Sequence, residues 1–283
     1  MSMKWHLFGI ALTACWLLGT PSTNAQTTLK APSFFNEKER LALPALSGLN
    51  RLRFVTTLDF PPFNTVNDAG QLSGYNVDLA RALCSQMRLS DICQIEAVPW
   101  RELEAKLESG EAEAVIAGIG ISETTREKFL FTRPYMRLPA RFITKKANTF
   151  SDQPAIVTKD KNVGVVTNTA HEQLLKAYFP SAIAKTYADR TSLLNGLKAD
   201  EVAAVFDDGM ALSFWLESDE ANNCCSFTDG PYLAPQFLGQ GMSIAVAPKD
   251  TALASAFNNA LQSLQQQGKL TELYLRYFPN SFY

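Results

Sequence analysis

The stretch TTLDFPPFN, residues 56–64, decides how the first part of this chain folds. Its first residues complete the apolar segment 52–58, which predicts a buried β-strand. Two consecutive prolines cannot donate hydrogen bonds to a sheet, so the strand has to end at Pro61-Pro62. A fixed, extended loop that carries aromatic rings must follow, and loops at strand ends are common places for ligand sites. The stretch therefore predicts a strand whose carboxyl end presents aromatic side chains.

Strand and helix patterns alternate from this stretch to the end of the chain. Asn76 is a candidate N-cap for a helix that follows the first strand. Alternation of strand, helix and strand predicts parallel sheets with right-handed crossovers. Strands are predicted over 92–98, 112–121, 141–145, 163–166, 202–206 and 242–246, and helices over 77–87, 100–108, 122–128, 170–178, 192–197, 211–216, 253–264 and 270–277.

The repetition of one pattern predicts two similar α/β lobes with central sheets and flanking helices. The chain has 283 residues, which exceeds the usual size of a single core. The predicted first lobe comprises residues 51–138 and 237–283, and the second comprises 139–236. A hinge of two strands would join them, and residues 26–50 would form an N-terminal extension. A crevice between lobes, at the carboxyl ends of strands, is the natural place for a small ligand.

The amino-terminal residues predict export. A short basic start is followed by the apolar stretch Trp5–Gly19, which has the length of a signal-peptide core rather than of a membrane span. The small residues Thr23-Asn24-Ala25 suit cleavage before Gln26, so residues 1–25 are predicted to be a signal peptide. Leu12-Thr13-Ala14-Cys15 also fits a lipobox, and lipidation of Cys15 is the alternative.

The charge balance argues against a nucleic-acid partner. The chain has 26 Lys and Arg against 28 Asp and Glu, a formal net charge of −2, and no basic stripe. The sequence has neither a Cys-x-x-Cys motif nor a histidine cluster, so no metal site is expected. No cofactor is expected either.

Four cysteines remain beyond the predicted signal peptide, in a compartment where disulfides persist. We expect Cys84 and Cys93 to pair and close a short loop between a helix and a strand. Cys224 and Cys225 could form a ring between neighbours, or could stay reduced and buried. All four could instead be small apolar filler.

Three positions at strand ends are candidates for ligand contacts. Phe60 is expected at the ligand site and Phe63 in the core, because prolines hold the loop between them. Arg126 begins a helix after a buried strand and could clamp a carboxylate, although it could also be a solvated surface residue. Asp207-Asp208 follows another apolar strand. One of these acids could bind an ammonium group, or could simply cap the next helix.

These residues also resemble a known family, the exported solute-binding proteins of amino-acid ABC transporters (family 3, type II periplasmic binding fold). The matching stretches occur in order over nearly the whole chain after the signal peptide. They are Asp59-Phe-Pro-Pro-Phe63, Gly74-Tyr-Asn-Val-Asp-Leu-Ala80, Pro99-Trp100, Ala114-Val-Ile-Ala-Gly118, Phe131-Thr-Arg-Pro-Tyr135, 202–208 and the ending Gly268-Lys-Leu with Tyr277-Phe278.

The resemblance implies a role for each candidate residue. Phe60 would stack on the ligand, and Trp100 would lie near it. Arg126 would bind an α-carboxylate and Asp208 an α-amino group. The remaining implied contacts, mainly through backbone groups, are Gly118, Gly120, Thr169 and Ala170.

The sequence departs from the family pattern at three of these places. The family arginine usually lies six residues before the phenylalanine that corresponds to Phe131, whereas Arg126 lies five before it and Thr125 occupies the usual place. Gly120 replaces a common serine or threonine, so one hydroxyl contact is absent. Thr57 stands where members with cationic ligands often have an acid, which argues against lysine or arginine as the ligand.

The resemblance implies a periplasmic, monomeric receptor that delivers an amino acid or a similar polar solute to an ABC permease. A cyclohexadienyl dehydratase-like enzyme on the same fold is one alternative, but such chemistry needs a placed general acid or base. His171 lies at a polar helix start, where a surface role is expected. An accessory protein of a periplasmic dehydrogenase is the other alternative.

Overall fold

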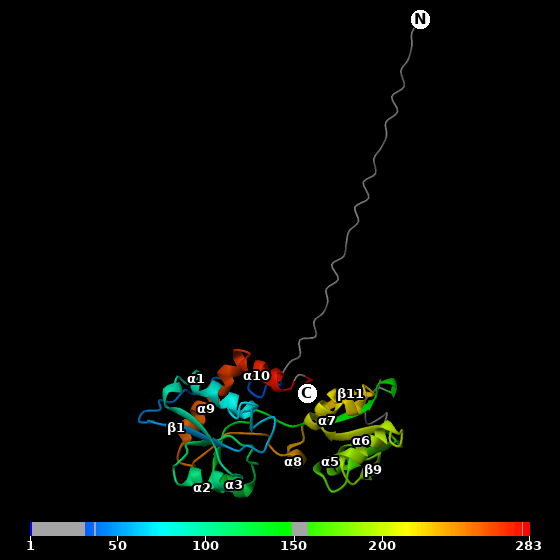
Figure 1. Ribbon diagram of the computed structural model, residues 1–283, viewed down its shortest axis with the longest axis horizontal. Coiled ribbons are helices and arrows are strands. Elements are labelled where there is room, and N and C mark those ends of the chain that lie inside the picture. The colour runs from blue at the N-terminus through cyan, green and yellow to red at the C-terminus, as the bar shows by residue number, and fades with distance from the viewer. Residues whose placement is uncertain (2–31, 37, 149–157, 279) are drawn as a thin grey trace.

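The structure is a computed structural model that describes residues 1, 32–36, 38–148, 158–278 and 280–283. The predicted signal peptide beyond Met1, including Cys15, lies outside these residues. Figure 1 shows two lobes side by side, with α1, α9 and α10 on the first and α5, α6 and α7 on the second. The predicted α/β fold with two lobes, each built on a central sheet, is confirmed.

The first lobe is built on the sheet β4-β1-β5-β12-β6. β1 pairs in parallel with β4 and β5, whereas β12 runs antiparallel to β5 and β6. The strands are β1 (Leu52–Thr56), β4 (Cys93–Ala97), β5 (Ala114–Val115), β6 (Leu130–Phe131) and β12 (Ala245–Val246); the helices are α1 (Tyr75–Gln86), α2 (Leu103–Glu108), α3 (Glu123–Lys128), α9 (Thr251–Gln266) and α10 (Lys269–Tyr277). A small hairpin of β2 (Thr65–Val66) and β3 (Leu72–Ser73) precedes α1.

Alternate residues of β1 fill the two layers of the first-lobe core. Phe54 packs with α1, α9 and α10, and its ring centroid lies 5.3 Å from that of Phe257. The next residue, Val55, joins the opposite layer with Leu103 and Leu107 of α2. Successive side chains of a strand point to opposite faces, so an apolar run is needed where helices cover both faces.

The second lobe is built on the sheet β11-β7-β10-β8-β9. β10, β8 and β9 run parallel, and β7 and β11 are antiparallel additions at one side. The strands are β7 (Ala140–Lys145), β8 (Asn162–Val166), β9 (Ile183–Tyr187), β10 (Ala204–Asp208) and β11 (Cys225–Tyr232); the helices are α5 (Ala170–Tyr178), α6 (Arg190–Lys198), α7 (Gly209–Glu217) and the short α8 (Pro235–Leu238). Phe142 packs against α5 in one layer and Ile143 against α6 and α7 in the other.

Two chain segments connect the lobes and pair with each other. Tyr135 N donates to Met242 O at 2.9 Å, and Met242 N donates to Met136 O at 2.7 Å. These segments lie between β6 and β7 and between β11 and β12. Their pairing supports the expected two-strand hinge.

The register fixes which edge of each sheet lies at this hinge. In the second lobe, the last residue of β10, Asp208, pairs with the first residue of β7, Ala140, which leaves the hinge. In the first lobe, Ala245 pairs antiparallel with Val115, so the segment that enters β12 from the hinge passes the carboxyl end of β5. The carboxyl ends of the parallel strands of both lobes therefore lie on the hinge side.

The N-terminal extension packs on the first lobe and along α9. The side-chain amide of Gln262 donates to the carbonyl oxygens of Asn36 and Glu39, at 3.0 and 2.7 Å. The carboxylate of Glu39 forms an ion pair at 2.5 Å with Arg133, which lies just before the hinge. Phe35 is buried in the first-lobe core.

Several local expectations need correction. Gly74, not Asn76, is the N-cap of α1; Asn76 lies inside the helix, where its Oδ1 accepts a bond of 2.8 Å from the hydroxyl of Tyr135. The predicted strand over 112–121 is a regular strand only at Ala114–Val115. Strands β9 and β11 were not predicted at all. Residues 237–238, expected in the first lobe, lie in α8 and pack on the second-lobe core.

The four cysteines beyond the predicted signal peptide form two disulfide bonds. The bond between Cys84 and Cys93 links the end of α1 to the start of β4, as predicted. Of the two alternatives for the other pair, the structure has the bond between the neighbours Cys224 and Cys225. Within the described ranges, no helix is both long and apolar enough to cross a membrane.

Candidate functional site

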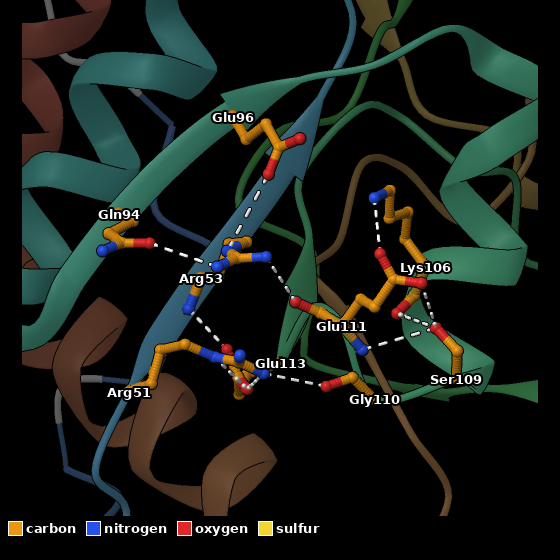
Figure 2. A network of polar contacts seen from close by, with 9 residues as sticks. All are labelled: Arg51, Arg53, Gln94, Glu96, Lys106, Ser109, Gly110, Glu111 and Glu113. Atoms are coloured by element: carbon orange, nitrogen blue, oxygen red, sulfur yellow. Dashed lines mark hydrogen bonds and ion pairs between the residues drawn. The ribbon is translucent and has the colours of Figure 1, made fainter.

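The amino and carboxyl edges of the first-lobe sheet differ in whether their charged side chains bind one another. At the amino edge, a network of hydrogen bonds and ion pairs joins the start of β1 to β4, α2 and the turn before β5 (Figure 2). Glu113, for example, accepts from Arg51 Nη2 at 2.7 Å and from the backbone N–H of Arg53 at 2.6 Å. Groups that satisfy one another in this way have little left for a ligand, so the candidate site lies at the opposite, carboxyl edge.

Phe60 forms a wall at the carboxyl end of β1. Its ring is partly buried and lies 4.8 Å, centroid to centroid, from that of Phe63, which is fully buried as predicted. On its other side the ring lies against Gly118, just past β5; a Cβ added at Gly118 would be 3.2 Å from Phe60 Cε1. The glycine, with φ at +81°, therefore leaves room for the ring.

Thr57 and Trp100 lie at the same edge in opposite environments. Thr57 is only 2% exposed, and its hydroxyl accepts a bond of 3.4 Å from Asn64 Nδ2. Trp100 is 54% exposed in the turn that follows β4. Trp100 thus offers a ring to a ligand in this structure, whereas the side chain of Thr57 belongs to the interior of the loop.

Arg126 lies on the short helix α3 and is exposed. Among the described residues, no hydrogen bond or ion pair of its guanidinium is recorded. Its neighbour Thr125, at the place where the family usually has arginine, uses its hydroxyl in the capping box of α3 and donates to Gly120 O at 2.8 Å. Thr125 is thus occupied, whereas the exposed Arg126 is available to a ligand; Gly120 is also exposed.

Thr169 and Ala170 begin α5 at the carboxyl end of β8. The hydroxyl of Thr169 accepts from Glu172 N at 3.2 Å, as an N-cap, and donates to Val166 O at 2.7 Å. Ala170 is the first residue of the helix. The first backbone N–H groups of a helix lack intrahelical partners and can bind an acidic group.

Asp208 caps α7 at the carboxyl end of β10. Its Oδ1 accepts from Ala211 N at 2.7 Å, so the helix-capping role considered from the sequence is present. Burial raises the pKa of the Asp208 carboxyl above its usual range. The hydrogen bond from Ala211 and the nearby His171 and Arg190 oppose this rise but do not cancel it.

A charged cluster that the sequence pattern does not predict lies beside Asp208. The carboxylate of Asp207 is almost completely buried and accepts bonds from Arg190 Nε at 2.5 Å and Nη2 at 3.2 Å. His171 Nδ1 lies 3.6 Å from Asp207 Oδ1. We refer to Asp207, Arg190 and His171 as the second-lobe cluster.

The expected surface role of His171 is wrong, because its side chain is only 16% exposed. Burial lowers the pKa of its imidazole; Arg190 lowers it further, and Asp207 and Asp208 oppose the shift. The cluster joins residues from three parts of the sheet edge: Asp207 lies in β10, and His171 and Arg190 follow β8 and β9. The sequence Asp189-Arg-Thr-Ser192 is typical of a helix start and could have located Arg190 at the beginning of a helix. The strand β9, which leads to this helix, has no clear sequence pattern.

The arrangement can bind a small polar solute by charge and by stacking. Both carboxyl edges present helix starts and charged groups on the hinge side, and the first-lobe edge adds the rings of Phe60 and Trp100. In the part of the chain that the structure describes, no group of three or more His, Cys, Asp or Glu side chains could hold a metal ion.

Comparison with known proteins identifies a family that shares this architecture. The family described as bacterial extracellular solute-binding proteins, family 3, matches residues 52–280. The chain belongs to this family. The match spans both lobes and the hinge and leaves out the N-terminal extension.

Relatives of this family 3 protein are named as receptors for amino acids. The ABC transporter arginine-binding protein 1 of Escherichia coli (strain K12) is 28% identical over 237 residues, which cover 82% of this chain and 93% of the relative. The L-arginine-binding protein of Pseudomonas aeruginosa is 27% identical over 246 residues, with 86% and 93% covered. The L-cystine solute receptor of Neisseria gonorrhoeae, solved in its unliganded open conformation, shares the fold with a TM-score of 0.67 at 20% identity, with 81% of this chain and 92% of that chain covered.

Proposed function

We propose that this family 3 protein is a periplasmic receptor that captures an amino acid or a similar small polar solute between its lobes and delivers it to an ABC permease. The observation that carries the proposal is the strand register, which turns the carboxyl ends of both parallel sheets toward the hinge. Closure about the hinge would bring the two edges together around one ligand, without a covalent step. The receptor would act as a monomer and without a cofactor.

The residues at the two edges supply complementary contacts in this proposal. Arg126 would bind the α-carboxylate of the ligand, and Asp208 would accept from its amino group. The ring of Phe60, supported by Phe63 and Gly118, would stack on the ligand, and Trp100 would cover it. The remaining proposed contacts are the backbone groups of Gly118, Gly120, Thr169 and Ala170, and Thr57 would shape the loop that holds Phe60.

Thermal-shift screening tests this proposal. Purified protein is scanned against amino acids, keto acids and polyamines. A ligand present at about 100 times its Kd stabilises the folded state by about 2.7 kcal/mol, which corresponds to a rise in Tm of roughly 5–10 °C for a chain of this size. No shift with any compound of these classes would contradict the proposal.

The variant Arg126→Ala tests the clamp itself. It should remove most of the ligand-induced shift while leaving the Tm of the free protein within about 1 °C, because Arg126 is exposed and has no recorded partner. Arg40→Ala is the matched control, since Arg40 is also exposed, has no partner among the residues that the structure describes and lies in the N-terminal extension. An unchanged ligand shift in Arg126→Ala would exclude Arg126 as the clamp.

The enzyme alternative has a direct test. The relatives in this family are binding proteins, but His171 beside Asp207 is a pair of titratable groups at the proposed site. Turnover of prephenate or arogenate by the purified protein, lost in His171→Gln, would show a dehydratase. We expect no turnover.

A further inference from the structure

Arg190 is held in place by a carboxylate that the solvent cannot reach. The side chain of Asp207 is 2% exposed and that of Arg190 is 44% exposed. Nε and Nη2 of the guanidinium point inward to the two oxygens of Asp207. An arginine fixed in this way has already lost most of its conformational freedom, so a group that binds its outer side has less entropy to overcome.

Arg190 keeps hydrogen-bond donors for a partner. A guanidinium has five N–H groups, and no bond of Nη1 is recorded within the described residues. Asp207, in contrast, already accepts two bonds from Arg190 and lies close to His171, so it is poorly placed to accept an ammonium group as well. The unused donors at this edge of the second lobe therefore favour an anion.

The other titratable groups around Arg190 do not reverse this preference. Asp189 is engaged as the N-cap of α6 through Ser192 N at 2.7 Å, and Asp208 caps α7. His171 is partly buried beside Asp207, and this burial lowers the pKa of its imidazole. The starts of α5, α6 and α7 follow the parallel strands β8, β9 and β10, and each helix start carries partial positive charge.

We propose that Arg190 is a ligand-contacting residue of the second lobe and that the solute carries two acidic groups, as a dicarboxylic amino acid does. Arg126 takes one carboxylate and Arg190 the other; this inference rests on the proposed receptor function. The exposed Asp59, next to Phe60, and Asp208 are then the acids that can receive an amino group. Thr57, neutral and buried, offers no charge to a cationic side chain.

The competing ligand class is a cationic amino acid, which would use the exposed Asp59. Calorimetric titration with L-glutamate, L-aspartate, L-glutamine and L-arginine separates the two. The expected result is that the dicarboxylates bind about 10–100 times more tightly than glutamine, because a hydrogen-bonded charged pair adds about 1.5–3 kcal/mol. A glutamine or arginine complex as tight as the dicarboxylate complexes would overturn the inference.

Variants of Arg190 test whether the preference for dicarboxylates over glutamine depends on this residue. Arg190→Met alone leaves Asp207 buried without its partner, so the double variant Arg190→Met/Asp207→Asn is the main test. In it the ratio of glutamate to glutamine affinity should fall to about one, while the affinity for glutamine changes less than about threefold. Lys198→Met is the matched control, because it removes a positive charge from the other end of the same helix and should keep the ratio. A double variant that retains the preference would overturn the proposal.

Arg190→Lys keeps the test informative should the double variant fail to fold. It keeps the charge but loses the planar fork, and the preference should fall at least threefold. An unchanged preference in a folded Arg190→Lys would contradict the assignment. Binding of glutamine or arginine without binding of either dicarboxylate leaves the receptor function standing and removes only this inference. No binding of any compound by the wild type removes both.

Discussion

The two carboxyl edges of the molecule are built differently. At the first-lobe edge, aromatic rings pack on one another and on glycine. The charged groups Asp59 and Arg126 are exposed there and have no partner among the described residues. At the second-lobe edge, three acids already have partners: Asp207 has Arg190, Asp208 has Ala211 N, and Asp189 has Ser192 N. We infer from this difference that the first lobe supplies an aromatic surface and unpaired charged side chains. The second lobe supplies the guanidinium of Arg190, which Asp207 holds in one orientation.

The largest expected effect is a loss of stability when the loop that carries the first-lobe rings is disturbed. Gly74 has φ at +122°, and a Cβ added there would lie 2.2 Å from the carbonyl oxygen of Phe63. Gly74→Ala should therefore destabilise the protein by about 3 kcal/mol or more and displace the loop that carries Phe60. Thermal and urea unfolding measure the loss.

Gly70→Ala is the control for Gly74→Ala. Gly70 also has positive φ, at +72°, but no atom lies within 4 Å of its added Cβ. Only the backbone cost of about 1 kcal/mol should appear. Equal losses in the two variants would mean that the contact with Phe63 does not matter.

The next effect concerns binding rather than folding. Loss of the unpaired Arg126 should weaken ligand binding about 10–100-fold with little change in stability, because a charged hydrogen bond to the ligand is lost and none within the protein. Loss of Asp207 should affect both properties, since it also positions Arg190. Titration and thermal unfolding of Arg126→Ala and Asp207→Ala, side by side, distinguish these patterns.

The two neighbouring acids of the second lobe should differ in how much they stabilise the fold. Asp207→Ala should cost about 1–2 kcal/mol: removing one partner of a buried ion pair is costly, but Arg190 is partly exposed and can be solvated. Asp208→Ala should cost about 1 kcal/mol through the lost N-cap of α7. A smaller loss in Asp207→Ala than in Asp208→Ala would show that the Asp207–Arg190 pair is not what holds this edge together.

The smallest expected effect is a dependence on pH. Burial lowers the pKa of His171 in the folded state, so the unfolded state binds the proton more readily and acidification destabilises the fold. The loss begins near the ordinary histidine pKa of about 6.5 and continues as the pH falls toward the lower folded value. Asp208, whose pKa burial raises, works in the opposite direction.

Comparison with His171→Gln isolates the histidine contribution. Between pH 7.5 and 5.5 the Tm of the wild type should fall further than that of the variant, by an amount that corresponds to no more than about 1.4 kcal/mol. Parallel pH profiles of the two proteins would show that His171 is protonated equally in the folded and unfolded states.

Features that depend on short-range patterns follow from the sequence alone. The apolar run before Pro61-Pro62 specified a strand that ends in an aromatic loop. The alternation of strand patterns and helix patterns along the chain specified two α/β lobes. The disulfide between Cys84 and Cys93 was predictable because those residues flank one short helix-to-strand connection. These features follow from backbone sterics and hydrophobic burial, which act over a few residues at a time.

The contacts between polar groups from different strands depend instead on how each lobe packs as a whole. Strand β9 was hidden because it is a short edge strand of mixed polar and apolar side chains, none of them fully buried, and β11 because it contains Gly230-Pro231. Without β9, the position of Arg190 could not be inferred. His171, Arg190 and Asp207 come together because their strands lie side by side in parallel register, and the order of strands in a sheet is set by packing of the whole lobe rather than by any local stretch of chain.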